Sequence, residues 1–330
     1  LASSIPAGGG QCSSHSRTGG TETVKKTYFD TLLELVKGDP NLVFIKGDTA
    51  YVPQLQAACP DQYLDVGIAE QDMIGVAAGM ALEGKTPITY SIVNFSSMRC
   101  LEQIRNTVAY HNLNVKVISC GAGFDYGFLG ATHHATEDLG IMRGMPNMTV
   151  FSPCDPYEMV AVLKTAVKLN GPCFIRIGHG GEKNLHSAPL ETFEVGQAYE
   201  LVPGQAISIF ATGAIAADAV EAAQCLHKSG YDVGVYSVPT LKPIDRETIA
   251  HCARQSKLIV AVEEHNIFGG LGSAVAEIMA ETPGTRAILR RVGMRDAFAK
   301  VVGTQEFLKK TYCIDADGII EDIQEGLKEV

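Results

Sequence analysis

YLDVGIAEQDMIGVAAGMAL, residues 63–82, joins a short apolar run to a longer helical pattern through the pentapeptide GIAEQ at positions 67–71. The run 63–66 predicts a strand, and the small-residue stretch 71–82 predicts a helix. A parallel α/β sheet opens its ligand crevice at the carboxyl ends of its strands, which is where Glu70 is expected to lie. Its carboxyl group is there either a ligand-binding group or an acid favoured at a helix start by the helix dipole.

Short β-rich runs and longer helical patterns alternate on both sides of this segment. Buried strands between helical crossovers predict parallel sheets covered on both faces, so the expected fold is α/β with two domains. The predicted strands are 42–45, 63–66, 87–92, 115–119, 149–151, 173–177, 207–210, 233–238, 257–262 and 287–290. The predicted helices are 22–36, 71–82, 98–110, 156–169, 215–227, 246–253, 271–279, 305–310 and 319–327.

Composition along the chain predicts where the domains divide. Residues 1–21 are rich in Gly and Ser and lack periodicity, so we expect a flexible leader there. The first domain is expected over residues 22–180 and the second over 205–330. Between them, residues 181–204 interrupt the alternation with several Gly and Pro residues, which is typical of a linker.

The overall composition excludes several classes of partner. The chain is 46% hydrophobic and 19% charged, which is enough apolar material for sizeable cores. Its net charge of −10 argues against binding to nucleic acid or to an anionic membrane. There is no apolar run of about 20 residues and no basic-then-apolar start typical of a secretory signal. The nine cysteines form no Cys-x-x-Cys pair, which favours buried reduced thiols and a cytoplasmic protein.

Further residues could carry chemistry at the same sheet edge. Phe95 follows the predicted strand 87–92, so its ring lies either at this edge or in the core. His133 and His134 lie in the glycine-rich loop 121–135, where imidazoles serve recognition or proton transfer, or are simply solvated. No Cys or Asp accompanies them at a ligand spacing, so no metal site is expected.

Arg176 is a charge inside the apolar predicted strand 173–177. A guanidinium in such a strand must be paired or must lie at the edge of a site. The two solutions are a phosphate or carboxylate ligand and an internal salt bridge, and the sequence leaves both open.

The ordered set of these motifs resembles the transketolase family, whose members depend on thiamine diphosphate. The resemblance runs from about residue 23 to the end and implies a pyrimidine-binding domain followed by a transketolase C-terminal domain. It also implies transfer of a two-carbon ketol unit between sugar phosphates or related sugars. The segments that carry it are GIAEQ (67–71), NFS (94–96), GATHH (130–134), MPNMTVFSPCD (145–155), FIRIG (174–178) and VAVEEHNIFGGLG (260–272).

The resemblance assigns a role to each candidate residue. Glu70 would share a proton with N1′ of the cofactor's aminopyrimidine and thereby activate it, while Ile68 and Phe95 would complete the cofactor-binding group. His133 would face the reacting carbon as a catalytic and substrate-binding residue, and His134 and Arg176 would bind substrate. Leu129, Gly121, Ala131 and His134 stand where transketolases have Asp, His, Pro and Gln, which predicts an altered sugar specificity.

The family motif Gly-Asp-Gly, which holds the diphosphate through Mg²⁺, does not occur, because the pairs 38–39 and 47–48 continue with Pro and Thr. This predicts a split enzyme in which a partner, an N-terminal-type transketolase subunit, carries Mg²⁺ and the diphosphate-binding domain. An α2β2 assembly is expected, with the small-residue stretch 75–80 as a candidate interface. The competing interpretations are the beta subunit of a 2-oxo acid dehydrogenase first component, a deoxyxylulose-phosphate synthase-like enzyme, and a non-catalytic scaffold subunit.

Overall fold

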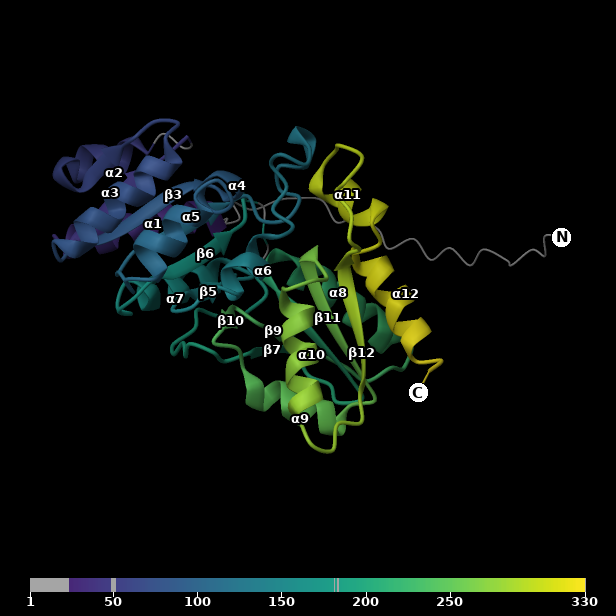
Figure 1. The fold of residues 1–330 in the computed structure, drawn as a ribbon. Helices are drawn as coiled ribbons and strands as arrows, with labels where there is room; N and C mark the ends of the chain where they lie inside the picture. The colour runs from purple at the N-terminus through teal and green to yellow at the C-terminus, as the bar shows by residue number, and fades with distance from the viewer. Residues whose placement is uncertain (1–23, 49–51, 181, 183, 330) are drawn as a thin grey trace.

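The computed structural model describes residues 24–48, 52–180, 182 and 184–329, which build two α/β domains (Figure 1). The predicted fold class is therefore confirmed. The leader expected at residues 1–21 lies outside the described residues. No helix within the described ranges is both long enough and apolar enough to span a membrane.

The first domain is built on a seven-stranded sheet in the order β10-β5-β6-β4-β3-β1-β2. Its strands pair in parallel except at the edge, where β10 runs antiparallel to β5. β10 follows β9 (Val233–Ser237), a strand of the second domain, so the chain returns to the first sheet. The strands are β1 (Leu42–Lys46), β2 (Tyr63–Asp65), β3 (Thr86–Ile92), β4 (Lys116–Cys120), β5 (Thr149–Phe151), β6 (Cys173–Ile177) and β10 (Thr240–Lys242).

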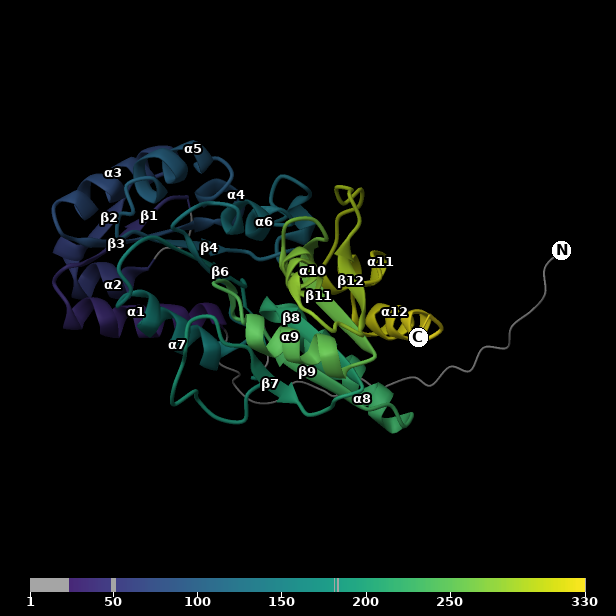
Figure 2. The same ribbon diagram turned by 60° about the horizontal axis from the view of Figure 1, so that its bottom comes forward.

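Helices cover both faces of this sheet because successive strand side chains point to opposite sides. In β1, Phe44 packs into the core cluster below α1 and α7, whereas Val43 and Ile45 join the cluster below α3. Figure 2 shows α1 and α7 on one side and α3 and α5 on the other. The helices are α1 (Val24–Gly38), α2 (Pro53–Ala58), α3 (Glu70–Leu82), α4 (Val93–Ser96), α5 (Leu101–Gln103), α6 (Asp138–Arg143) and α7 (Pro156–Ala166), with single turns at Pro60–Gln62 and Gly127–Leu129.

The helix predicted over residues 98–110 is divided in the structure. Only α5 and a π-helical stretch, Ile104–Ala109, are helical there. The preceding residues 93–96 instead form α4, and a turn follows at 97–100. Phe95 therefore lies on a short helix directly after β3, and Arg99 lies in the turn beside it.

The second domain has a five-stranded sheet in the order β12-β11-β8-β9-β7, with β7 antiparallel to β9. The helices α8 and α12 cover one core cluster, and α9 and α10 cover the other. Its strands are β7 (Tyr199–Val202), β8 (Ile207–Thr212), β9 (Val233–Ser237), β11 (Leu258–Asn266) and β12 (Ile288–Met294). Its helices are α8 (Ala216–Lys228), α9 (Arg246–Gln255), α10 (Leu271–Glu281), α11 (Gln305–Thr311) and α12 (Ala316–Gly326), with a single turn at Gly213–Ile215.

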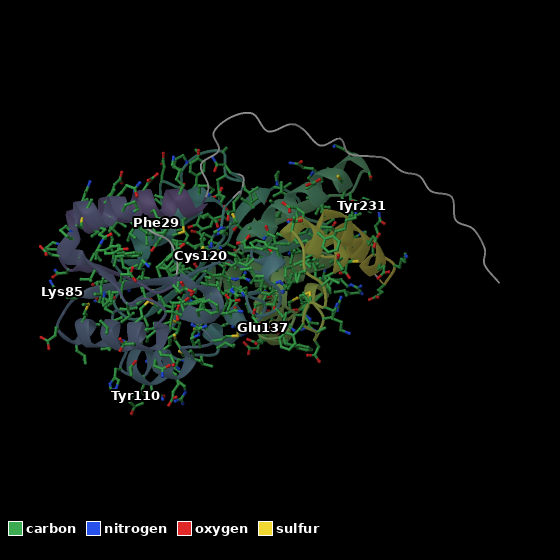
Figure 3. The ribbon with its side chains drawn as sticks, turned by 90° about the horizontal axis from the view of Figure 1, so that it is seen from above. Phe29, Lys85, Tyr110, Cys120, Glu137 and Tyr231 are labelled. Carbon is green, nitrogen blue, oxygen red and sulfur yellow. The ribbon has the colours of Figure 1, made fainter. Side chains whose placement is uncertain are left out.

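The carboxyl end of the first sheet faces the second domain. In Figure 3, Cys120 at the end of β4 lies in the middle of the molecule, whereas Lys85 before β3 lies at the far end. The end of β11 contacts the loops that follow β4: the amide of Phe124 donates to Glu264 Oε1 at 2.7 Å, and the amide of Asn266 donates to the Thr136 carbonyl at 2.7 Å. The second domain thus holds the loop that carries the two predicted histidines.

Candidate functional site

Glu70 begins α3 and lies between the ends of β1 and β3. Its side chain is buried, and its Oε1 accepts the Asp48 amide at 3.2 Å and the Ser91 hydroxyl at 3.0 Å. Gly47 leaves room for this placement, since a Cβ there would lie 2.9 Å from Glu70 Cγ. The carboxylate is thus held in one orientation by its neighbours.

Arg99 approaches the other oxygen of the same carboxylate. Its Nη1 donates to Glu70 Oε2 at 2.6 Å, and its guanidinium carbon lies 4.1 Å from the centroid of the Phe95 ring. The Arg99 side chain is 40% exposed, whereas that of Glu70 is fully buried. A flat cation therefore occupies the space between a fixed carboxylate and an aromatic face.

These contacts determine the ionisation of Glu70. Burial by itself would raise the pKa of the carboxyl group. The hydrogen bonds from the Asp48 amide, Ser91 and Arg99 outweigh burial and lower the pKa below its ordinary value. Glu70 is thus an ionised carboxylate in this arrangement, and Arg99 is its counter-charge.

His133 joins this group from a distant loop. Its ring lies edge to face with Phe95, with 5.2 Å between the centroids, and 6.4 Å from Tyr126. The loop is anchored because Asn94 Nδ2 donates to the Thr132 carbonyl at 2.8 Å. Three residues singled out from the sequence, Glu70, Phe95 and His133, therefore share one site.

Two further residues line the same region and were missed in the sequence. The Tyr126 hydroxyl lies 3.1 Å from His179 Nδ1, and His179 is exposed. Burial raises the pKa of Tyr126, and the nearby Cys120 raises it further, so the hydroxyl stays protonated. The sequence signal that could have pointed to His179 is its position between two glycines, directly after the strand that contains Arg176.

Arg176 does not belong to this site. Its side chain is 1% exposed, its Nε lies 3.0 Å from Asp138 Oδ2, and its Nη2 donates to the carbonyls of Ala135 and Glu264. Of the two solutions left open by the sequence, the structure adopts the internal ion pair. The substrate-binding role implied by the resemblance needs an accessible guanidinium, so we correct it here.

His134 is likewise turned inward. It is 3% exposed, its Nε2 lies 3.2 Å from the Gly127 carbonyl, and its ring packs edge to face on Phe124. Burial lowers its pKa, which keeps the ring neutral. His134 holds the loop to the protein rather than facing a substrate, which also corrects the sequence prediction. Ile68 is 73% exposed on the turn before α3, so its cofactor role stays a prediction.

Within the described ranges, Cys154, Asp155 and His186 have side-chain atoms close enough to hold a metal ion. Their hydrogen bonds indicate a different role. Asp155 caps α7 through the Glu158 amide and also accepts the amides of Leu185 and His186. This cluster therefore fastens the segment after β6 to the start of α7.

The comparisons with known proteins agree with this architecture. The family model for the transketolase pyrimidine-binding domain matches residues 22–180, and that for the transketolase C-terminal domain matches residues 196–319. The B subunit of the apulose-4-phosphate transketolase of Actinobacillus succinogenes is 36% identical, over 91% of this chain and 97% of that protein. The SqwH subunit of the 6-deoxy-6-sulfo-D-fructose transketolase of Clostridium sp. (strain MSTE9) is 36% identical, over 92% of this chain and 94% of that protein.

A solved split gene transketolase, an inactive β4 tetramer, has a TM-score of 0.85 to this chain at 36% identity and covers 93% of this chain and 98% of its own. Each alignment covers more than nine-tenths of both this chain and the relative. The chain therefore belongs to the transketolase family, with the pyrimidine-binding and C-terminal domains and the extent of the C-terminal-type subunit of a split transketolase.

Proposed function

We propose that the chain is the catalytic C-terminal-type subunit of a split, thiamine-diphosphate-dependent transketolase that transfers a two-carbon ketol unit between sugar phosphates or related sugars. The observation that carries this proposal is the buried Glu70 carboxylate, held at the end of the first sheet and joined to the Phe95 ring through Arg99. Single subunits of two sugar transketolases are relatives of nearly equal length.

The residues present fit an aminopyrimidine. A flat group that donates an N–H to Glu70 and stacks on Phe95 already fits between them, because the Arg99 guanidinium does both. Glu70 and Phe95 would hold the pyrimidine of thiamine diphosphate, with Ile68 at the edge. When bound, the cofactor supplies the electron sink for cleavage and formation of a C–C bond next to a carbonyl.

Glu70 would hold a proton at the pyrimidine ring nitrogen N1′. Burial favours the neutral carboxyl, while the Asp48 amide and the Ser91 hydroxyl favour the carboxylate. A carboxyl group balanced in this way can share a proton with a ring nitrogen. The Asp48 amide and Ser91 would also keep it oriented toward the ring, which lowers the entropic cost of reaction.

His133 would donate or accept a proton at the oxygen atoms of the sugar. Its ring lies edge to face with Phe95, so it lies beside one of the residues that would hold the cofactor. Tyr126 and His179 extend the polar surface beyond it and would bind sugar hydroxyls. Leu129 is 45% exposed on the same loop and would present an apolar side chain where transketolases place Asp.

We also infer a partner chain that brings the diphosphate-binding domain and Mg²⁺. The names of the two sugar transketolase relatives support a second subunit, because each names one subunit of its enzyme. The exposed face of α3 supports the place of contact: Gly75 and Gly79 have no neighbour within 4 Å of an added Cβ, and Leu82 is 70% exposed. Small residues permit close backbone approach, so this face would form the contact with the partner chain in an α2β2 assembly.

The test is reconstitution of the full chain with a co-expressed diphosphate-binding partner. Binding of thiamine diphosphate with Mg²⁺ is measured by calorimetry, and ketol transfer is measured from a ketose phosphate to an aldose phosphate. Glu70→Gln is expected to reduce the transfer rate by about 10²–10⁴-fold. Glu34→Gln is the control, because Glu34 is an exposed acid of α1, away from both the site and the exposed face of α3.

Equal activity of Glu70→Gln and the wild type would contradict the catalytic role and favour a scaffold subunit. Decarboxylation of pyruvate in place of ketol transfer would favour the 2-oxo acid dehydrogenase or the deoxyxylulose-phosphate synthase interpretation.

A further inference from the structure

We propose that Arg99 is a displaceable occupant of the pyrimidine-recognition site: its guanidinium takes the contacts of the cofactor's aminopyrimidine when the cofactor is absent and withdraws when it binds. This inference rests on the proposed function, since it requires that Glu70 and Phe95 receive the pyrimidine. It adds a residue that controls the affinity of the site for its cofactor.

The first argument is geometric. The Arg99 guanidinium is planar, lies over the Phe95 ring at 4.1 Å and donates from Nη1 to Glu70 Oε2 at 2.6 Å. A flat heterocycle that stacks on this ring face and bonds this oxygen would occupy the same volume. The other oxygen, Oε1, already accepts two hydrogen bonds, from the Asp48 amide and the Ser91 hydroxyl. The guanidinium and the heterocycle therefore compete for one place.

The second argument is electrostatic. A carboxyl group beside a guanidinium loses its proton more readily, and Arg99 contributes to the low pKa of Glu70. A carboxyl group that shares a proton with a ring nitrogen needs the opposite tendency. Withdrawal of Arg99 removes one of the hydrogen bonds that lower this pKa, so that burial, the largest influence, is opposed by fewer of them. The Arg99 contact thus opposes the protonated state that the proposed role of Glu70 requires.

The third argument is that Arg99 can leave without disturbing the backbone. Its amide donates to the Asn94 carbonyl at 3.0 Å, and its carbonyl accepts Gln71 Nε2 at 3.1 Å, so the main chain is held at both groups. The side chain itself is 40% exposed and lies in the turn between α4 and α5. Rotation of the side chain into solvent costs the ion pair and the ring contact and leaves both backbone hydrogen bonds in place.

While Arg99 occupies the site, Glu70 keeps a counter-charge. A buried carboxylate that loses its partner is strongly destabilised, so the guanidinium stabilises the cofactor-free protein. The same contact weakens cofactor binding. The apparent affinity is the intrinsic affinity multiplied by the fraction of molecules in which Arg99 has left the site.

The test measures binding rather than turnover, on the full chain co-expressed with its diphosphate-binding partner. Thiamine diphosphate is titrated in the presence of Mg²⁺ into the wild type, Arg99→Met, Arg99→Gln and Arg99→Lys. Arg99→Met and Arg99→Gln are expected to bind about three- to tenfold more tightly, because the competitor is removed. Arg99→Lys keeps the charge without the flat face and is expected to bind with an affinity between those of the wild type and Arg99→Met. Arg105→Met is the matched control, since Arg105 is an exposed arginine of the same segment that bonds Asn106.

Two further readouts separate competition from a general effect on structure. Calorimetry at pH 6 in buffers of different ionisation enthalpy gives the protons taken up on binding, and the uptake is expected to be smaller for Arg99→Met than for the wild type. Without cofactor, Arg99→Met is expected to be less stable to urea at pH 8 than the wild type, because Glu70 then lacks its counter-charge.

The outcomes distinguish this inference from the proposed function. Unchanged or weaker binding by Arg99→Met and Arg99→Gln, with normal binding by the wild type, would show that Arg99 is a permanent partner of Glu70 and overturn the inference alone. Absence of binding by the wild-type complex would overturn the proposed function as well.

Discussion

The rings of Phe95 and His133 meet edge to face with their centroids 5.2 Å apart, although one belongs to the short helix after β3 and the other to the long loop after β4. The contact joins a residue expected to stack on the cofactor to a residue expected to act on the sugar. β3 and β4 are neighbours in the sheet, so their carboxyl ends present both side chains at the same edge.

Replacement of His133 by Asn is expected to lower the turnover number of the assembled enzyme by about 10²–10⁴-fold, because the proton donor that we propose for the sugar oxygens is lost. The thermal midpoint should not change, since His133 is only partly buried. Steady-state kinetics and a melting curve check both statements. His111→Asn, in an exposed position beside Tyr110, is the control, and similar kinetic losses in both variants would contradict a catalytic role.

Gly47→Ala is expected to weaken cofactor binding about tenfold or more while the chain still folds. The added Cβ would lie 2.9 Å from Glu70 Cγ and 3.2 Å from Ser91 Oγ, so the carboxylate must move from its place. A misplacement of about 1 Å at a catalytic group can cost 10²-fold in rate. The measurement is calorimetric titration with thiamine diphosphate and Mg²⁺.

Gly38→Ala provides the comparison, because an added Cβ there has nothing within 4 Å. Equal affinities of both alanine variants would mean that Glu70 does not need this position to bind the cofactor.

Arg176→Ala is expected to lower the free energy of unfolding by about 3–5 kcal/mol, because it leaves the Asp138 carboxylate buried without its partner. Arg143→Ala removes a more exposed ion pair with Glu277 and should cost about 0–1 kcal/mol. Urea unfolding of both variants checks the difference. A stable Arg176→Ala variant with a raised KM for a phosphorylated sugar would restore the substrate role that the structure argues against.

The strands and most helices could be predicted because alternation and helical periodicity are local properties of the chain. β5 and β6 occupy the predicted residues, and α3 begins one residue before its predicted start. The prediction was wrong at residues 98–110, where an apolar pattern of helical spacing is divided into a turn, α5 and a π-helical stretch. Periodicity reports which residues are buried, not which backbone hydrogen bonds form.

The site was predicted in part for a related reason. Glu70 and Phe95 follow strand ends, so topology alone brings them together. The partners of Arg176 could not be read in the same way, because Asp138 and the carbonyls of Ala135 and Glu264 come from distant parts of the chain. Arg99 escaped notice because an arginine in a turn has no distinguishing pattern, and only the fold shows what it contacts.

The stability of the first domain is expected to depend on pH through His186. Burial lowers the pKa of His186, but its bond to Glu158 at 3.0 Å outweighs burial and raises the pKa above 6.5. A raised pKa adds stability that is complete below the unfolded-state value and is lost as pH rises through the folded-state value. The difference in free energy of unfolding between the wild type and His186→Gln should therefore shrink as pH rises from about 6.5.

Urea denaturation at a series of pH values measures this difference. His251→Gln, at an exposed position of α9, is the comparison variant. A difference that stays constant across the series would mean that His186 is neutral in the folded protein.

The exposed face of α3 leads to a prediction about assembly. Asp72, Gly75, Gly79 and Leu82 recur every three or four residues and are all solvent-facing, so they form one stripe along the helix. Lysines at both glycine positions would keep another backbone from approaching this stripe. The double variant Gly75→Lys/Gly79→Lys is therefore expected to bind the diphosphate-binding partner at least about tenfold more weakly, since apolar contact and close approach are both lost.

The same variant should not lose stability as a separate chain. Glycine inside a helix costs about 1 kcal/mol relative to better helix formers, so lysine at these two solvent-facing positions favours the helix. Sedimentation velocity of the co-expressed subunits measures association, and urea unfolding of the separate chain measures stability. Gln224→Lys on the exposed side of α8 controls for the added charge. Because stability and association are expected to change in opposite directions, full assembly of the double variant would place the partner on another surface of the chain.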